Sequence, residues 1–325
     1  MRNNNLCNLA EPILSVITPS LNHGRFLRET IESVINQSYR NFEHIIIDGG
    51  SADETLDILK QYPHIRWISE KDSSPMEAYQ KGLSMARGKY IIQCCVSDGF
   101  LDMHWFKKCV EVLDDDIETT LVWGLPQDMS EGGDLLEVAY TEFFSDPPPQ
   151  KQEFLALWLA NGFVLPEGNY CVRSEIIKQF FPNVQSQKYF QIHCHLGFMY
   201  QFMIQGYCPY FLSMIANFGR IHHDQRSQLF FDIEKPAAAM YFKSIKNYMK
   251  LMFTHEAKHY FRNGRSEVIG EIRPSELMSL LIKIWRNKIF RSRILRLDPY
   301  TLLLKIMNRV KGNSKRGHFS KEDLR

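Results

Sequence analysis

Apolar runs in the first hundred residues end in small or acidic residues, and stretches with helical periodicity separate them. Ile13–Thr18 leads into Pro19, Glu43–Asp48 leads into two glycines, and Tyr90–Cys95 reaches Asp98 within three residues. Strands that alternate with helices predict an α/β fold with a mostly parallel sheet and right-handed crossovers. Ligands of such sheets bind beyond the carboxyl ends of the strands, so we expect the ends of these runs to form the binding edge.

The alternation continues to about residue 124, after which the pattern changes. Helical periodicity marks the segments Phe26–Ile35, Leu56–Leu59, Met76–Arg87 and Asp102–Leu113. Strand-like runs mark Arg66–Ser69 and Leu121–Gly124. Three prolines in Asp146–Pro149 interrupt the pattern, and from Lys235 the sequence is strongly helical. We therefore expect an N-terminal tail at 1–11, an α/β domain at 12–234 and a helical, basic C-terminal extension at 235–325.

Composition limits the class of protein. With 325 residues, 44% of them hydrophobic and 23% charged, the chain can bury a sizeable core and has the balance of a globular protein. The sequence contains no apolar run long enough to span a membrane, no signal-peptide pattern and no CxxC pair among its seven cysteines. These features predict a cytoplasmic protein with reduced cysteines.

The net charge is only +2, but it is unevenly distributed. Eleven Lys or Arg residues stand between Lys283 and Arg316 against one acid, Asp298, which leaves about −8 for the rest of the chain by subtraction. Apolar residues and Trp285 alternate with these charges, as in helices that lie on anionic membrane surfaces. We therefore favour peripheral contact with the inner face of a membrane. The alternative is a helix packed on the α/β domain. No nucleic acid partner is expected, because no nucleic-acid-binding module accompanies the charge.

Four segments together resemble a known family. They are Ser15–Asn22 (SVITPSLN), Thr30–Tyr39 (TIESVINQSY), Phe42–Ser51 (FEHIIIDGGS) and Ala86–Tyr90 (ARGKY). Over roughly residues 12–230 the chain is similar to the family 2 glycosyltransferases of the GT-A fold. The resemblance implies a GT-A type sheet flanked by helices, and transfer of a sugar from a nucleotide-diphosphate donor with inversion.

The resemblance assigns donor contacts to two strand ends. In the family, the loop after the first strand and the acid after the second contact the nucleoside, which points to Thr18, Pro19 and Asp48. A carboxylate suits this place because it accepts hydrogen bonds from a base N–H or a ribose hydroxyl. The alternative role for Asp48 is a cap on the following helix.

Two further segments extend the donor site. Ser69–Asp72 (SEKD) and Ala78–Gly82 (AYQKG) resemble family segments that follow the third strand, although Gln80 stands where asparagine is common. The resemblance makes Asp72 a second donor contact and places Lys81 near the phosphates. A solvated surface position is the alternative for Lys81.

Asp98 matches the last position of the family's Asp-x-Asp metal motif. Mg²⁺ or Mn²⁺ takes hard oxygen ligands, often one or two carboxylates together with substrate phosphates, and would neutralise the leaving diphosphate. The sequence departs from the motif on both sides, because Val96 replaces the usual first acid or amide and Gly99 replaces a frequent second aspartate. Asp98 is thus expected to hold the metal as the motif's single acid.

An inverting transfer needs a base that takes the proton of the acceptor hydroxyl. The family supplies an aspartate from an acidic pair about twelve residues before a glycine, and counting back from Gly206 reaches Cys194 and His195 instead. His195 is the leading candidate because imidazole titrates near neutrality. His193 is the second candidate. The alternative is that these histidines are structural and that the base is absent or lies elsewhere, as at Glu167.

Two later segments complete the expected site. Glu167–Arg173 (EGNYCVR) resembles the family's acceptor-side segment, with Glu167 and Arg173 as its charged residues. Arg220–His223 (RIHH) resembles a late Arg-x-His loop, in which His222 or His223 supplies a metal ligand or a hydrogen bond near the phosphates. An ordinary loop histidine is the alternative for each.

The function expected from this resemblance is sugar transfer to a glycan or lipid-linked acceptor in surface polysaccharide biosynthesis. A non-catalytic homologue that binds nucleotide sugars or serves as a scaffold is the alternative, since the acidic pair is missing. A nucleotidyltransferase is disfavoured because the chain lacks a Gly-rich phosphate loop with Arg or Lys. The sequence identifies neither the sugar, nor the base, nor the acceptor.

Overall fold

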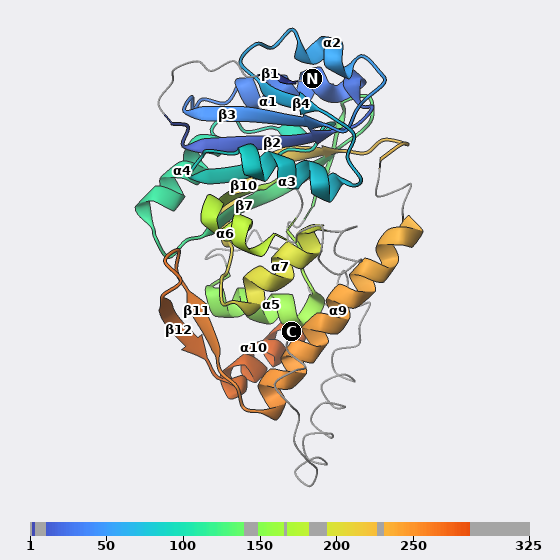
Figure 1. The fold of residues 1–325 in the computed structure, drawn as a ribbon. Coiled ribbons are helices and arrows are strands. Elements are labelled where there is room, and N and C mark those ends of the chain that lie inside the picture. Colours follow the sequence, from blue (N-terminus) through green and yellow to red (C-terminus); the bar gives the residue numbers. More distant parts are fainter. Residues whose placement is uncertain are drawn as a thin grey trace.

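The computed structural model describes residues 2–3, 11–139, 149–165, 168–181, 194–225 and 231–286 (Figure 1). Its strands are β1 (Arg2–Asn3), β2 (Leu14–Ser20), β3 (Phe42–Asp48), β4 (Arg66–Ser69), β5 (Tyr90–Gln93), β6 (Gly99–Phe100), β7 (Leu121–Met129), β8 (Leu135–Val138), β9 (Tyr170–Arg173), β10 (Tyr210–Arg220), β11 (His259–Arg262) and β12 (Val268–Ile272). Its helices are α1 (Gly24–Ile35), α2 (Thr55–Leu59), α3 (Pro75–Met85), α4 (Trp105–Asp115), α5 (Lys151–Asn161), α6 (Ser174–Phe180), α7 (Cys194–Ile204), α9 (Phe231–Thr254) and α10 (Pro274–Arg286).

One large mixed sheet organises the molecule, with strand order β1-β4-β3-β2-β5-β9-β7-β10-β6 and β8 paired to β7. Strands β4, β3, β2 and β5 are mutually parallel, which confirms the predicted βα alternation. Strand β9 is antiparallel to both β5 and β7, and β10 is parallel to β7. Strands β2 to β5, β7 and β10 therefore end at the same edge of the sheet.

Alternating residues of the parallel strands pack on opposite faces of the sheet. Ile45 and Ile47 join the core under α3, whereas Ile46 joins the core formed with α1 and α2. This alternation is the side-chain period of two that a strand imposes. Gly82 allows α3 to approach the sheet closely, because a Cβ there would lie 2.4 Å from Cγ2 of Ile17.

The C-terminal helices pack against the same core as the sheet. One hydrophobic cluster contains Ile17 and Trp123 of the sheet together with Trp158 of α5 and Tyr241 of α9. Figure 1 shows α9 running alongside α5 and α7. The expected boundary at 234/235 lies within the first turn of α9. The β11–β12 hairpin between α9 and α10 is an element that the helical sequence pattern does not predict.

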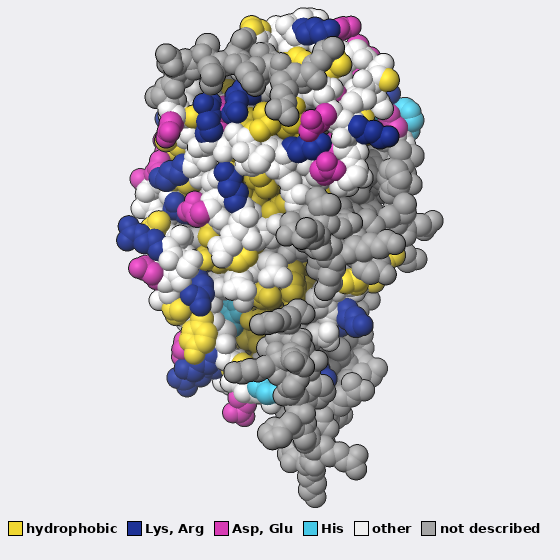
Figure 2. Space-filling view, in the orientation of Figure 1, with side chains coloured by type: hydrophobic (Ala, Val, Ile, Leu, Met, Phe, Trp, Pro, Cys, Tyr) yellow, Lys and Arg dark blue, Asp and Glu magenta, His cyan; other side chains and the backbone are white. Residues whose placement is uncertain are grey.

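Helix α10 contains the start of the basic segment, and one of its faces packs inward while Ile282 is exposed. Leu277 and Leu281 are fully buried, and Lys283 pairs with Glu153 of α5 at 3.6 Å. The part of the segment after residue 286 lies outside the described residues. On the face in Figure 2, the described Lys and Arg side chains are interspersed with acidic ones. Among the helices of the described ranges, none is long and apolar enough to cross a membrane.

Candidate functional site

Asp48 ends β3 at the expected edge and is fully buried. Its carboxylate accepts hydrogen bonds from the hydroxyl of Ser69 at 2.6 Å and from the backbone N–H groups of Gly50 and Ser51 at 3.2 and 3.1 Å. The Ser51 hydroxyl donates to the other oxygen. Asp48 was alternatively expected to cap the following helix, but its partners are the N–H groups and the hydroxyl of the turn at 49–51. Asp48 therefore fixes the shape of that turn.

Asp72 lies directly over this turn. Its Oδ2 is 3.0 Å from the point where a Cβ at Gly49 would stand, so a side chain at position 49 would press on the Asp72 carboxylate. Burial raises the pKa of Asp72, and the neighbouring charges of Glu77, Asp48 and Glu70 add to the rise against the opposing effect of Lys81. Asp72, Asp48 and Lys81 are therefore near enough to interact electrostatically.

Lys81 of α3 is held by acidic neighbours. Its Nζ lies 3.1 Å from Oε1 of Glu70 and 3.3 Å from Oε1 of Glu77. Burial alone would lower the pKa of Lys81, but the two carboxylates outweigh it and raise the pKa. Lys81 is therefore held in place by two acidic side chains, and its own side chain is 20% exposed.

Asp98 stands between β5 and β6, where it meets the end of β10. Its Oδ1 accepts the N–H of Arg220 at 3.1 Å, and its backbone carbonyl accepts the hydroxyl of Thr30 at 2.7 Å. A hard cation bound here would take one carboxylate from the protein and would need the diphosphate or water for its other ligands. This donor set is compatible with Mg²⁺ or Mn²⁺.

Packing explains both departures from the two-acid motif. Val96 is 9% exposed and belongs to the core of α1 and α2, so an acid at this place would lose its hydration. At Gly99 a Cβ would lie 2.7 Å from the ring of Phe218 and from Oγ of Ser33. The close pairing of β6 with β10 therefore excludes a second aspartate.

Arg220 connects Asp98 to three other parts of the chain, and its side chain is 2% exposed. The guanidinium donates to the backbone carbonyls of Ser97, Ser130 and Glu131 at 3.3, 3.1 and 3.0 Å. It also forms an ion pair with Glu29 of α1. Arg220 thereby holds the Ser97 carbonyl through its side chain and the Asp98 carboxylate through its backbone N–H.

The structure separates the two histidines of the late loop. His222 is 4% exposed, its Nδ1 lies 2.5 Å from Oδ1 of Asp224, and its ring packs on Phe26. The side chain of His223 is 72% exposed and bonds to Glu131 at 3.2 Å. Of the two, His222 is therefore the residue that faces the interior beside Arg220.

Comparison with known proteins identifies the domain that carries this edge. Residues 15–163 match the family model described as Glycosyl transferase family 2. These residues form a family 2 glycosyltransferase domain. The match includes the strand ends at Asp48 and Asp98 together with Asp72 and Lys81.

Curated relatives of this glycosyltransferase domain are similar over part of their length. The chain is 29% identical over 133 residues to chondroitin synthase from Escherichia coli, covering 40% of this chain and 19% of that protein. It is 39% identical over 87 residues to the putative teichuronic acid biosynthesis glycosyltransferase TuaG from Bacillus subtilis, covering 25% and 34%. The matched part of the chain thus spans about a fifth to a third of the length of these relatives.

Solved structures confirm the GT-A fold of the glycosyltransferase. TarS 1–349 from S. aureus in complex with UDP has a TM-score of 0.50 at 15% identity, over 74% of this chain and 72% of that one. The mannosyltransferase PcManGT from Pyrobaculum calidifontis, in complex with GDP-Man and Mn²⁺, also has a TM-score of 0.50, at 11% identity over 94% and 89%.

Some residues expected in the glycosyltransferase site point elsewhere. Thr18 is fully buried and bonds to Nε2 of His44 at 2.9 Å, and burial lowers the pKa of that histidine to about 3. The Thr18 side chain therefore faces a neutral imidazole inside the core, and not the space where a nucleotide-sugar donor was expected. Pro19 contributes its carbonyl, which accepts the N–H of Val96 at 3.4 Å.

Arg173 requires a correction, because it lies at the opposite edge of the sheet. Strand β9 runs antiparallel to β5 and pairs Arg173 with Tyr90, the first residue of β5. The guanidinium is buried and donates to the carbonyls of Leu113, Asp116 and Thr119 at 2.6, 3.2 and 3.0 Å. Arg173 therefore caps the end of α4 instead of lining the acceptor side.

His195 lies near the start of β9 and is 3% exposed. Its Nδ1 is 2.7 Å from the hydroxyl of Tyr170, and the rings of Tyr79 and Phe181 are each 5.9 Å from its own ring. Glu167 and His193, the other sequence candidates for a base, lie outside the described residues.

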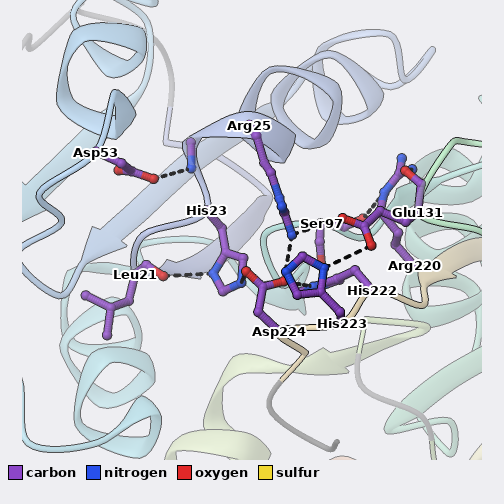
Figure 3. Close-up of polar contacts among 11 residues, drawn as sticks. Leu21, His23, Arg25, Asp53, Ser97, Glu131, Arg220, His222, His223 and Asp224 are labelled. Carbon is purple, nitrogen blue, oxygen red and sulfur yellow. Dashed lines mark hydrogen bonds and ion pairs between the residues drawn. The ribbon is translucent and has the colours of Figure 1, made fainter. Parts of the chain in front are cut away.

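A group of residues around the late loop, at 220–224, is not predicted by the sequence patterns. Arg25 bonds to Asp224 at 2.6 Å and pairs with Glu131 at 3.3 Å, and His23 stands beside them (Figure 3). His23 directly follows the recognised segment that ends at Asn22. The contact between Arg25 and Asp224 joins residues 199 positions apart, which no local pattern reveals.

Replacing Asp72 with asparagine should weaken donor binding without weakening the fold at pH 7. The raised pKa means that Asp72 contributes stability below pH 3.8 and loses it as the pH rises through the folded-state pKa. At pH 7 its charge is unfavourable, so D72N should unfold at the same or a higher temperature. Donor affinity should fall at least about tenfold with the loss of a charged acceptor.

The measurements for Asp72 are thermal unfolding and calorimetric titration with nucleotide sugars. Asp57→Asn is the matched control, because the Asp57 side chain is 77% exposed on α2 and should change neither quantity. A lower unfolding temperature for D72N at pH 7 would contradict the assigned electrostatics.

Proposed function

We propose that this chain transfers a sugar from a nucleotide-diphosphate donor to a glycan or lipid-linked acceptor with inversion, in surface polysaccharide biosynthesis. The observation that supports the proposal is that Asp72 interacts electrostatically with Asp48 and Lys81, and that Asp48 and Asp98 both follow parallel strands at the same edge of the sheet. The names of the relatives from E. coli and B. subtilis supply the polysaccharide context.

Each of these residues has a proposed role toward the donor. The turn fixed by Asp48 supports the nucleoside, and Asp72 accepts a hydrogen bond from it. Lys81 attracts the phosphates. Asp98 holds Mg²⁺ or Mn²⁺, which when bound neutralises charge on the leaving diphosphate. Mn²⁺ accompanies GDP-Man in the mannosyltransferase of the same fold.

His195 is the proposed base for the acceptor hydroxyl. Nδ1 of His195 bonds to the Tyr170 hydroxyl, which holds the ring in one orientation. His195→Gln should lower kcat about 100-fold or more and leave KM for the donor near its original value, because a base acts only in the transition state. Tyr170→Phe should have a smaller effect. Unchanged kcat in H195Q would remove His195 from the mechanism.

A donor screen tests the proposed function as a whole. The protein is mixed with UDP-, GDP- and dTDP-sugars in the presence of Mn²⁺, and thermal unfolding and sugar hydrolysis are measured. One nucleotide class should stabilise the fold by about 2.7 kcal/mol at 100 times its Kd. Stabilisation without turnover in a full acceptor panel would favour the non-catalytic alternative. No stabilisation by any nucleotide sugar would contradict both functions.

The proposed location is the cytoplasm, with the basic C-terminal segment on the inner face of a membrane. The charge between Lys283 and Arg316 supports this proposal. Its described start, α10, packs inward, so the membrane contact is assigned to the residues that follow. A lipid-linked acceptor would be reached most directly from such a surface.

A further inference from the structure

Two buried asparagine side chains near the start of β9 each contain an oxygen without a bonding partner. Asn169, just before β9, is fully buried, and Asn217, on β10, is 2% exposed. No hydrogen-bond partner for the Oδ1 atom of either residue occurs in the described part of the chain. Buried side-chain oxygens are bonded in most native proteins, so two unbonded ones indicate that donors from outside the chain bind here.

Gly168 brings the two asparagines close to each other. It directly precedes Asn169, and a Cβ at Gly168 would lie 3.4 Å from Nδ2 of Asn217 and 3.5 Å from the carbonyl oxygen of Gln93, at the end of β5. Nδ2 of Asn169 donates to the carbonyl of Gly124 on β7, and the carbonyl of Asn169 accepts the Gly124 N–H at 3.1 Å. These two bonds hold Asn169 in place and leave its Oδ1 available.

Asn217 lies on the strand that leads to the proposed metal ligand. It stands three residues before Arg220, a distance of about 10 Å along a strand, and the N–H of Arg220 contacts Asp98. The register of β10 is regular from Asn217 onward, so Gly219 points to the same face as Asn217. A Cβ at Gly219 would have no neighbouring atom within 4 Å. The face of β10 between Asn217 and the Asp98 contact is therefore open.

Asn169 lies next to the residue that orients the proposed base. It directly precedes Tyr170, whose hydroxyl bonds to Nδ1 of His195. Asn217 is thus near the residue assigned to the leaving diphosphate, and Asn169 is near the residue assigned to the acceptor hydroxyl. A sugar in transfer is bonded to the diphosphate and attacked by the acceptor, so it lies between these two groups. Its hydroxyl groups are donors of the kind that the two amide oxygens lack.

We propose that Asn217, together with Asn169, binds a hydroxyl group of the transferred sugar and so contributes to the choice of donor. This inference rests on the proposed function. A buried amide that bonds a substrate hydroxyl rejects a sugar that lacks this hydroxyl or holds it in the other orientation, because the amide is then left unpaired. Oδ1 of Asn217 has no bond within the described chain to give up when a sugar binds.

Asn217→Leu separates sugar binding from folding, because leucine has nearly the shape of asparagine but no polar atoms. The substitution removes an unbonded buried oxygen, so N217L should unfold at the same temperature as the wild type or at a higher one. Asn217→Ala is the second variant, which adds no bulk near Gly168. Asn41→Leu is the matched control, since Asn41 is exposed in the loop before β3.

Calorimetric titration in the presence of Mn²⁺ compares each UDP-, GDP- or dTDP-sugar of the donor screen with its bare nucleoside diphosphate. For the matching donor, N217L and N217A should weaken binding of the nucleotide sugar at least tenfold and leave the Kd of the bare diphosphate within about twofold. The preference for the matching sugar over its epimer should fall with it. N41L should change none of these quantities.

The outcomes separate this inference from the proposed function. Failure of the wild type to bind any nucleotide sugar or diphosphate would contradict both. Equal binding of the nucleotide sugar by the wild type and the Asn217 variants would overturn this inference alone, and so would equal weakening of the bare diphosphate or a rise only in KM for the acceptor. Lower unfolding temperatures for both N217L and N217A would show that the amide supports the fold, which would also overturn it.

Discussion

Asp98→Asn is expected to lower metal-dependent donor hydrolysis and sugar transfer by about a thousandfold. The asparagine oxygen can still accept the N–H of Arg220, so the turn before β6 should persist. The variant loses the negative charge that holds the cation, and the cation supplies several kcal/mol of transition-state stabilisation. Because Val96 and Gly99 stand at the other two positions of the motif, the motif has no second carboxylate to replace it.

The measurement is the Mn²⁺ dependence of hydrolysis for the donor found in the screen. Asp115→Asn is the matched control, since Asp115 is an exposed acid at the end of α4. Equal unfolding temperatures for both variants would show that a loss of activity is local. Activity of D98N within tenfold of the wild type would exclude Asp98 as the main metal ligand.

Arg220→Met should have the largest effect on stability. The substitution removes donors to three backbone carbonyls and leaves them without their partner inside the protein. The Glu29 side chain that stays behind is 51% exposed and can be hydrated, so the main loss is that of the carbonyl contacts, about 1–3 kcal/mol for each acceptor left unsatisfied in the interior. The unfolding temperature should fall on the order of 10 °C, and donor binding should weaken because Asp98 loses its backbone support.

Urea unfolding of R220M and of the matched variant Arg25→Met measures this difference. The side chain of Arg25 is 41% exposed and pairs with Asp224 and Glu131 at the surface, so its loss should cost less than about 1 kcal/mol. Similar free energies of unfolding for the two variants would mean that the buried contacts of Arg220 contribute little to stability.

The parallel half of the sheet could be predicted because its signals are local. Ile45 to Ile47 alternate between two buried faces, and the turn after Asp48 has the glycines that its shape needs. Strand β10 escapes prediction because its register is irregular between Phe211 and Asn217, which blurs the period of two. The β11–β12 hairpin is short and lies between strong helical patterns.

The residues of the candidate site also divide into those that local signals place and those that depend on the tertiary path of the chain. Asp48, Asp72 and Lys81 meet as expected, because strand ends and crossover helices place them by topology. Arg173 was misplaced because four residues of antiparallel strand carry it to the other edge of the sheet. The contact of Arg25 with Asp224 depends on the tertiary path of the chain.

The hydrogen bond from Nε1 of Trp158 to the hydroxyl of Tyr241, at 2.8 Å, ties α5 to α9 inside the shared core. Tyr241 in turn donates to the carbonyl of Phe163 at 3.2 Å. The half of the molecule that carries Asp98 and the half that leads to the basic segment should therefore melt in a single transition. A chimaera that exchanges tails between relatives would need its junction beyond α10, where a new segment could be attached without opening the interior.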